Sequence, residues 1–253
     1  MSESSRLETL LKVELLNHMG NDLEVVNAAR VSFDKESKWE LYAGDQKVDG
    51  SFFEELRLPE KDARLIHYLV EHDHWSPFSH VVAKFRVKAP IVINHQLWKS
   101  HIGAATQDDI CGWNGVSRRY VDDEPEFFSP DMWRERAENL KQGSGDKSVF
   151  MMMPDDFGYT CRPETAYQDA VKHCLHIYKW LLASGVCPEQ ARIVLPQSMM
   201  TTWVWTGSLA FWARLFKLRM HPDAQEECKP VVLAIGQHMK ELFPISWEAL
   251  TGK

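Results

Sequence analysis

Alternation of apolar and polar residues predicts few strands in this chain. Residues 12–17 alternate as a first strand would, and residues 198–206 are rich in Thr, Trp and Val. The clearest strand signal is the apolar, β-branched run over residues 81–87. We therefore expect a small sheet.

Helical periodicity covers more of the chain. Between residues 60 and 72, apolar residues at 65, 66, 69 and 70 are spaced for one buried face, and Pro77 prevents that helix from extending. Asp22 is placed to cap a helix over residues 23–31, and Pro90 suits the first turn of a helix that runs to His101. The same reasoning predicts further helices over residues 163–184, 188–192, 207–219 and 223–242.

Three polar stretches predict connections between these elements. Residues 35–51 are polar and interrupted by glycine, residues 104–112 are polar and acidic, and residues 141–147 are typical of a flexible connector. The segments on either side of the last connector have too few core residues to fold separately. We therefore expect a single α+β (or α/β) domain over residues 1–253, with a small antiparallel or mixed sheet covered by long helices.

Composition limits the possible classes of protein. A length of 253 residues suits one large domain, and a net charge of −7 argues against a protein that grips nucleic acid. The five cysteines are widely spaced and form no Cys-x-x-Cys, which favours reduced thiols over disulfides or a zinc site. The polar first nine residues predict no signal peptide, and no apolar run approaches membrane-spanning length. We therefore expect a cytoplasmic protein without a membrane partner, in the host cytoplasm if a phage encodes it.

A histidine-rich turn over residues 72–80 offers the first candidate chemistry. The pair His72-Asp73 resembles that of the HD phosphohydrolases, whose metal lies in an all-helical pocket, but the strand predicted over residues 81–87 follows at once. No spacing matches a known metal-ligand pattern, so we expect no metal site. Two interpretations stay open for the histidines at 67, 72, 74 and 80: an ordinary polar turn, or contact with a ligand.

Cationic and hydrogen-bonding side chains cluster between residues 96 and 119. Gln96, Lys99 and Ser100 fall at i, i+3 and i+4 on one helix face. Two adjacent arginines, Arg118 and Arg119, offer forked donors that suit phosphate. Each set alone is typical of a solvated face, but together they favour a phosphate-bearing small ligand.

Two further arginines stand apart from that cluster. Arg192 is flanked by apolar residues, so we expect it to need an anionic partner in the core or in a ligand. Arg219 ends a predicted helix, where a cation complements the helix dipole. The chain has no glycine-rich dinucleotide fingerprint after a strand, no P-loop and no serine nucleophile elbow, so any dinucleotide is not held in the Rossmann manner.

Taken together, these segments resemble the flavin-dependent thymidylate synthases, the ThyX family, and especially its phage-type members. The opening segment, residues 13–34, is similar to the family's N-terminal strand and helix, and it includes Val-Val-Asn-Ala-Ala-Arg-Val-Ser-Phe at residues 25–33. His-Trp-Ser-Pro-Phe-Ser-His at residues 74–80 resembles its His-x-[Ser/Thr]-Pro-Phe-x-His turn. Residues 114–120 resemble the end of its signature Arg-His-Arg-x-x-Ser-x-Asn-Glu-x-Ser-x-Arg-Tyr. Further similar segments lie at residues 188–196, 206–207, 218–219, 223–225 and 243–247.

The resemblance implies a homotetramer with shared active sites. It also implies an enzyme that uses FAD, NADPH and methylenetetrahydrofolate to methylate dUMP at C5, which gives dTMP. In that family reduced flavin supplies the hydride, so no cysteine has to add to the pyrimidine. The resemblance makes Arg219 the catalytic residue, which stabilises charge as C5 becomes nucleophilic.

The same resemblance assigns ligand contacts to individual residues. The nucleotide-binding set is Gln96, Lys99, Gly115, Val116, Ser117, Arg118, Arg119, Arg192 and Arg219. The flavin-binding set is His74, Ser76, Lys99, Ser100, His101, Gly115, Ser208 and Arg214.

This chain departs from the family pattern within the signature itself. Lys99-Ser100-His101 replaces Arg-His-Arg, Gly115 replaces a Glu, and about eight extra residues at 104–111 interrupt the motif. Arg214 also replaces an Asn. One of the inserted aspartates, Asp108 or Asp109, could supply the missing carboxylate. The departures leave open another pyrimidine substrate (dCMP or UMP), a hydroxymethylated product, a non-catalytic nucleotide-binding relative and, more weakly, a metal-dependent phosphohydrolase.

Overall fold

A four-stranded antiparallel sheet is the centre of the protein. The computed structural model describes residues 10–46, 52–100, 112–119, 123–137 and 143–252. The sheet has the strand order β1-β4-β8-β5, and every neighbouring pair is antiparallel. All three strands expected from the sequence are therefore confirmed, and so is the small antiparallel sheet. The strands are β1 (Lys12–Met19), β4 (Val82–Pro90), β5 (Trp113–Gly115) and β8 (Met200–Ser208).

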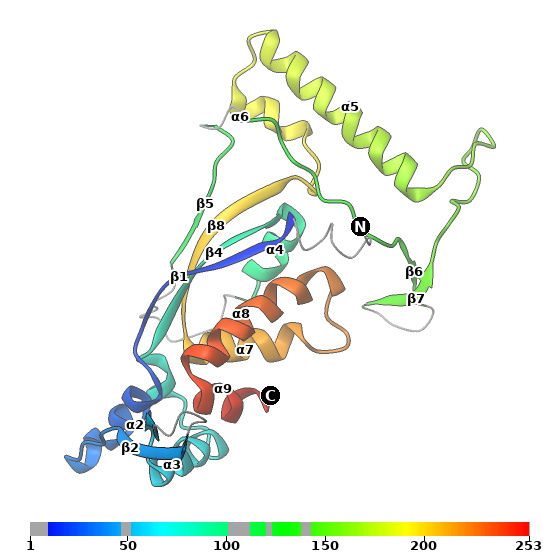
Figure 1. Ribbon diagram of the computed structural model, residues 1–253. Helices are drawn as coiled ribbons and strands as arrows, with labels where there is room; N and C mark the ends of the chain where they lie inside the picture. Colours follow the sequence, from blue (N-terminus) through cyan, green and yellow to red (C-terminus); the bar gives the residue numbers. More distant parts are fainter. Residues whose placement is uncertain (1–9, 47–51, 101–111, 120–122, 138–142, 253) are drawn as a thin grey trace.

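The sheet buries one face against C-terminal helices. Along β4, Ala83, Phe85 and Val87 are buried whereas Lys84 and Arg86 are exposed, which is the period-two pattern of a half-buried strand. Trp212 packs edge-on to Phe85 at 5.1 Å and donates through Nε1 to the Ala83 carbonyl at 3.3 Å. Figure 1 shows the helices α7 (Leu209–Arg219) and α8 (Lys229–Leu242) lying along this side of the sheet.

The remaining helices agree largely with the sequence predictions. Those over 60–72, 90–101, 163–184 and 188–192 are confirmed with small changes at their ends. In the structure they are α3 (Glu60–Glu71), α4 (Ile91–Trp98), α5 (Pro163–Ala183) and α6 (Pro188–Ala191). The other helices are α2 (Asp22–Arg30) and α9 (Pro244–Thr251), with 3-10 turns η1 (Val31–Phe33), η2 (Ser76–Ser79), η3 (Arg192–Val194) and η4 (Glu226–Cys228).

The expected role of Asp22 as a helix cap is wrong, because Asn21 occupies that position. The Asn21 side chain accepts from the Leu23 backbone N–H at 2.9 Å, and Glu24 reaches back to the Asn21 N–H. Asp22 is buried and accepts instead from the backbone N–H groups of Ile245 and Ser246, at 2.9 and 3.0 Å. It therefore caps the beginning of α9, more than 200 residues further along the chain.

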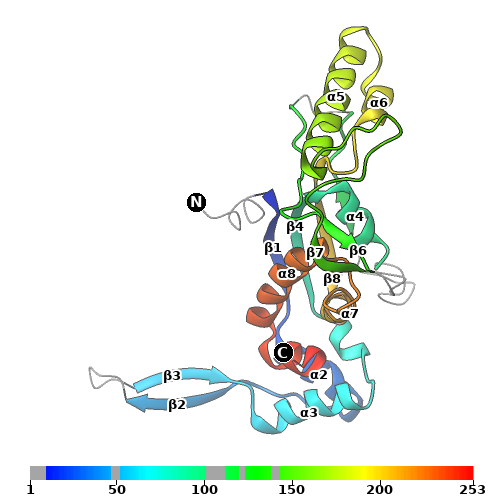
Figure 2. The ribbon, with the colours of Figure 1, turned by 90° about the vertical axis from the view of Figure 1, so that its right-hand side faces the viewer.

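Two regions expected to be irregular contain hairpins. Residues 35–51 were predicted to be a loop, but β2 (Glu40–Gln46) pairs with β3 (Phe52–Arg57). Figure 2 shows this hairpin projecting as an arm from the α2–α3 end of the molecule. Within the polar stretch over residues 141–147, β7 (Ser144–Ser148) pairs with β6 (Arg134–Arg136). The predictions of irregular structure were wrong there, because neither strand pair shows a clear alternation of apolar and polar residues.

No helix in the described part of the chain is both long and apolar enough to span a membrane.

Candidate functional site

The candidate residues gather in three groups at different heights along the molecule. One group surrounds the end of α4, a second lies beside α6, and a third follows α3. Figures 1 and 2, which are related by rotation about the vertical axis, both place α6 at the top, α4 in the middle and α3 at the bottom. A single chain therefore does not assemble all of the predicted ligand contacts in one place.

Arg219 is the most extensively bonded member of the group at the end of α4. Its guanidinium donates from Nε to Ser100 Oγ at 2.9 Å, and from Nη2 to both Ser100 Oγ and the Gln96 carbonyl at 2.6 Å. Arg219 was expected to be at least a cation at the end of its own helix. The structure adds that it caps a second helix, because the Gln96 carbonyl belongs to the last turn of α4.

The charge of Arg219 has no protein counter-ion among the described residues. Its relative exposure is only 9%, yet both of its hydrogen-bond acceptors are neutral, and no Asp or Glu of the described chain lies within ion-pair distance. Burial raises the pKa of the nearby Cys228 thiol to about 11, and the positive charge of Arg219 opposes that rise. A buried guanidinium held by neutral acceptors is suited to meet an anionic or electron-rich ligand.

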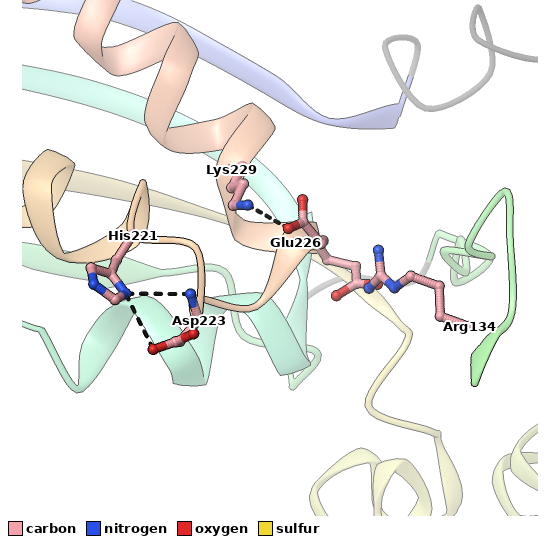
Figure 3. Close-up of polar contacts among 6 residues, drawn as sticks. Arg134, His221, Asp223, Glu226 and Lys229 are labelled. Carbon is pink, nitrogen blue, oxygen red and sulfur yellow. Dashed lines mark hydrogen bonds and ion pairs between the residues drawn. The ribbon is translucent and has the colours of Figure 1, made fainter. Parts of the chain in front are cut away.

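A cavity of about 800 Å³ adjoins this arginine group. Gln96 lines one side, Arg134 and Asp146 come from the β6–β7 hairpin, and the chain after α7 contributes residues 222–226. Figure 3 shows the polar contacts around it. His221 Nδ1 lies 3.5 Å from Asp223 Oδ2, and the neighbouring ion pairs are Arg134–Glu227 and Lys229–Glu226.

The second group lines a smaller cavity of about 470 Å³ beside the beginning of α4. Val116, Arg118 and Arg192 contribute to it, together with His95. Arg192 was expected to need an anionic partner in the core or in a ligand. The side chain is exposed and water can solvate it, so the core alternative is wrong and the ligand alternative stays a prediction.

Ser117 and Arg119 have partners within the chain. Arg119 donates from Nε to Ser117 Oγ at 3.1 Å, and its Nη1 pairs with Glu189 of α6 at 3.2 Å. Gly115 ends β5 opposite Trp203, and a Cβ at Gly115 would meet no atom within 4 Å. Among the described residues, nothing therefore occupies the space directly next to the position where the family Glu would begin its side chain.

The third group contains His74 and Ser76, both exposed, after the end of α3. His74 packs edge-on to Tyr68 at 6.2 Å. Ser208 is buried at the beginning of α7, where its Oγ accepts from the Phe211 N–H at 3.2 Å. Ser208 Oγ is thus occupied by helix capping. Among the described residues no set of His, Cys, Asp or Glu side chains has the arrangement of a metal site.

Three of the predicted features lie outside the described residues: His101, the inserted residues 104–111 and Tyr120. Other site residues were not anticipated from the sequence. Sequence reasoning missed His95 and the charged residues of the β6–β7 hairpin. His95 follows Ile91 by four positions on α4, a weak signal that it shares the cavity-lining face. Arg134 gives no such signal, because only the tertiary structure brings it next to Glu227.

Comparison with known proteins gives concordant results. A sequence profile of the family described as thymidylate synthase complementing protein (Thy1) matches residues 14–245. A flavin-dependent thymidylate synthase of Thermosipho africanus is 33% identical over 237 residues, which cover 94% of this chain and 89% of the relative. The corresponding enzyme of Thermus thermophilus is 32% identical over 241 residues, which cover 94% of this chain and 74% of the relative.

A solved structure also resembles this chain over almost its whole length. It is a UMP/dUMP methylase, PolB from Streptomyces cacaoi, bound with 5-Br dUMP. The two chains are 27% identical and superpose with a TM-score of 0.70, covering 96% of this chain and 95% of the other.

Proposed function

Because this chain belongs to the Thy1 family of flavin-dependent thymidylate synthases, we propose that it methylates C5 of a pyrimidine nucleotide, with dUMP as the substrate and dTMP as the product. The observation that carries this proposal is the fixed, uncompensated guanidinium of Arg219. From the family resemblance we expect the pyrimidine ring to lie beside this residue. Electron density must build up on the ring as C5 becomes nucleophilic, and a preorganised cation stabilises that charge.

The four cysteines that the structure describes support the proposed mechanism, in which no thiol attacks the pyrimidine. No cysteine is found among the described residues that line the two cavities. Cys228 is fully buried and its pKa of about 11 keeps it a neutral thiol at physiological pH. Arg219 therefore acts by fixed electrostatics in this proposal, and the pyrimidine stays free of a covalent bond to the protein.

The proposed nucleotide contacts lie at the two ends of α4. Gln96 and Lys99 lie at its C-terminal end, where Arg219 is anchored. Arg118 and Arg192 face the cavity at its N-terminal end and have the forked geometry that suits a phosphate. Val116, Ser117 and Arg119 lie on the same segment as Arg118.

Only some of the residues expected to contact the flavin have side chains that are available to a ligand. His74, Ser76, Lys99, Gly115 and Arg214 are exposed, and the cationic ones suit the pyrophosphate of FAD. Ser100 and Ser208 are buried and their hydroxyls already accept bonds from Arg219 and Phe211. A bound flavin would supply the hydride, with NADPH as reductant and methylenetetrahydrofolate as the one-carbon donor.

We propose that these groups complete one another across a homotetramer. Support comes from the separation of the three groups in one chain and from α5, where Tyr178 is the only buried residue. Lys84 and Arg86 also leave one face of the sheet polar and open to a partner. Size-exclusion chromatography with light scattering should report four times the 29.3 kDa chain mass. A monomer that binds FAD with full activity would contradict this proposal.

Tritium release from C5-labelled nucleotides tests the function. Purified protein should be yellow and should release tritium from dUMP when NADPH and methylenetetrahydrofolate are present. UMP is the second candidate substrate, because the structural relative PolB is a UMP/dUMP methylase, and dCMP is the third. Mass spectrometry of the product separates methylation from hydroxymethylation. A colourless protein that binds nucleotide without turnover would instead be a non-catalytic relative, and phosphate release dependent on added metal would indicate a phosphohydrolase.

A further inference from the structure

We infer that Ser100 is a positioning residue, whose hydroxyl holds the Arg219 guanidinium in the orientation that the reaction needs. This inference rests on the proposed function and assigns a role to a position where the family has a histidine. The family resemblance alone would place Ser100 against the flavin. The geometry points to a role inside the protein instead.

The contacts of Ser100 show how the guanidinium is held. Its Oγ accepts from both Nε and Nη2 of Arg219, at 2.9 and 2.6 Å, and the Gln96 carbonyl accepts a further bond from Nη2. Two nitrogens of the planar fork are thereby bound to the end of α4, which fixes the plane and the rotation of the group. No hydrogen bond from Nη1 is found among the described residues, and on the proposed function this edge would meet the ligand.

Ser100 is itself held rigidly. It is 2% exposed, its N–H donates to the Leu97 carbonyl at 2.9 Å, and its own carbonyl accepts from Arg214 Nη1 at 3.4 Å. One residue therefore joins the end of α4 to two arginines of α7. Because both Oγ lone pairs receive bonds from a cation, loss of the hydroxyl would release two donors of Arg219 at once.

A serine hydroxyl suits position 100 better than a carboxylate or an imidazole would. A carboxylate here would neutralise the guanidinium and weaken its effect on a pyrimidine. A histidine could supply only one acceptor nitrogen, and only in its neutral form. Serine orients the cation and leaves its charge uncompensated, which suits a residue that must act on developing negative charge.

The test compares Ser100→Ala with Ser100→Thr, which retains the hydroxyl. Ser100→Ala should lower kcat about ten- to hundredfold while KM for the nucleotide and flavin content change little, and Ser100→Thr should recover most of the loss. Ser37→Ala is the matched control, because Ser37 is also buried but lies between α2 and β2, where its backbone bonds to the Asn27 side chain. It should leave kcat unchanged.

A double-mutant cycle separates positioning from a general effect on the fold. In an Arg219→Ala background, Ser100→Ala should cause less than about a twofold further loss, because there is no guanidinium left to position. Additive losses, or an equal loss in Ser100→Thr, would overturn the inference.

A second measurement does not depend on turnover. An arginine-directed dicarbonyl reagent, with mass-spectrometric mapping, should label Arg219 severalfold faster in Ser100→Ala than in wild type or Ser100→Thr. Equal labelling in all three would also overturn the inference. If the wild type turns over none of dUMP, UMP and dCMP, the proposed function fails, and the labelling alone decides whether Ser100 holds Arg219.

Discussion

Replacement of Arg219 by Ala should reduce activity severely and stability hardly at all. The variant loses three hydrogen bonds, to Ser100 Oγ twice and to the Gln96 carbonyl once. Loss of a preorganised charge of this kind typically lowers kcat by about 10²–10³, or roughly 2.7–4 kcal/mol. Flavin content should remain close to that of the wild type.

The stability of this variant follows from two opposing terms. An unsatisfied carbonyl at the end of α4 costs about 1–3 kcal/mol. Removal of a buried cation that has no counter-ion recovers several kcal/mol of desolvation, so the two effects largely cancel. At roughly 2–4 °C per kcal/mol for a domain of this size, we expect Tm to stay within about 4 °C of the wild type.

Arg30→Gln provides the contrasting control. Arg30 pairs with Asp62, which is fully buried, so the variant leaves a buried carboxylate without its cation. Breaking such a pair costs about 3–5 kcal/mol, and Tm should fall much further than in Arg219→Ala. Thermal unfolding by circular dichroism and tritium release from labelled dUMP measure the two quantities. A large fall in Tm with normal turnover in Arg219→Ala would refute the electrostatic role and leave Arg219 as a helix cap.

Three further predictions concern titration, thiol reactivity and the inserted loop. Burial raises the pKa of Asp22 above its ordinary value of 3.8, although the N–H bonds from Ile245 and Ser246 oppose the rise. The folded state therefore binds this proton more tightly than the unfolded state, so the free energy of unfolding should fall as pH rises above 3.8. Asp22→Asn should remove this pH dependence in denaturant titrations, and an unchanged pH dependence would contradict the prediction. At about pH 8 iodoacetamide should modify the exposed Cys187 and spare Cys228, whose pKa is about 11, until the protein is denatured; equal rates by peptide mapping would exclude the buried, neutral thiol. If Asp108 or Asp109 replaces the missing Glu, its hydrogen bond should contribute roughly 1.5–3 kcal/mol. Changing both to Asn should then lower turnover by one to two orders of magnitude or shift the preferred pyrimidine. Unchanged kinetics on dUMP, UMP and dCMP would contradict this role.

Local patterns were sufficient for most of the regular elements. The run at residues 81–87 and the apolar spacing between residues 60 and 72 predicted β4 and α3 correctly, because burial of one face imposes a period of two or 3.6 residues. The hairpins β2–β3 and β6–β7 were missed for the opposite reason. Their strands are paired in two-stranded sheets outside the four-stranded sheet, so they lack the alternation that burial in a core would impose.

The family was readable from the sequence alone, because short motifs in a constant order survive large changes between them, and the role of Arg219 stays a prediction. The arrangement of the side chains was not readable in this way. Whether Arg219 meets a carboxylate or a hydroxyl depends on the contact between α4 and α7, over a separation of more than 100 residues. Asp22 is a second example: its residue type and position are typical of an N-cap for the adjacent helix, but its side chain caps the distant helix α9. The sequence by itself thus determined most of the regular elements of the four-stranded sheet and its helices, since these follow from neighbouring residues. The tertiary structure alone decided which side chains meet, because that depends on how distant segments pack against each other.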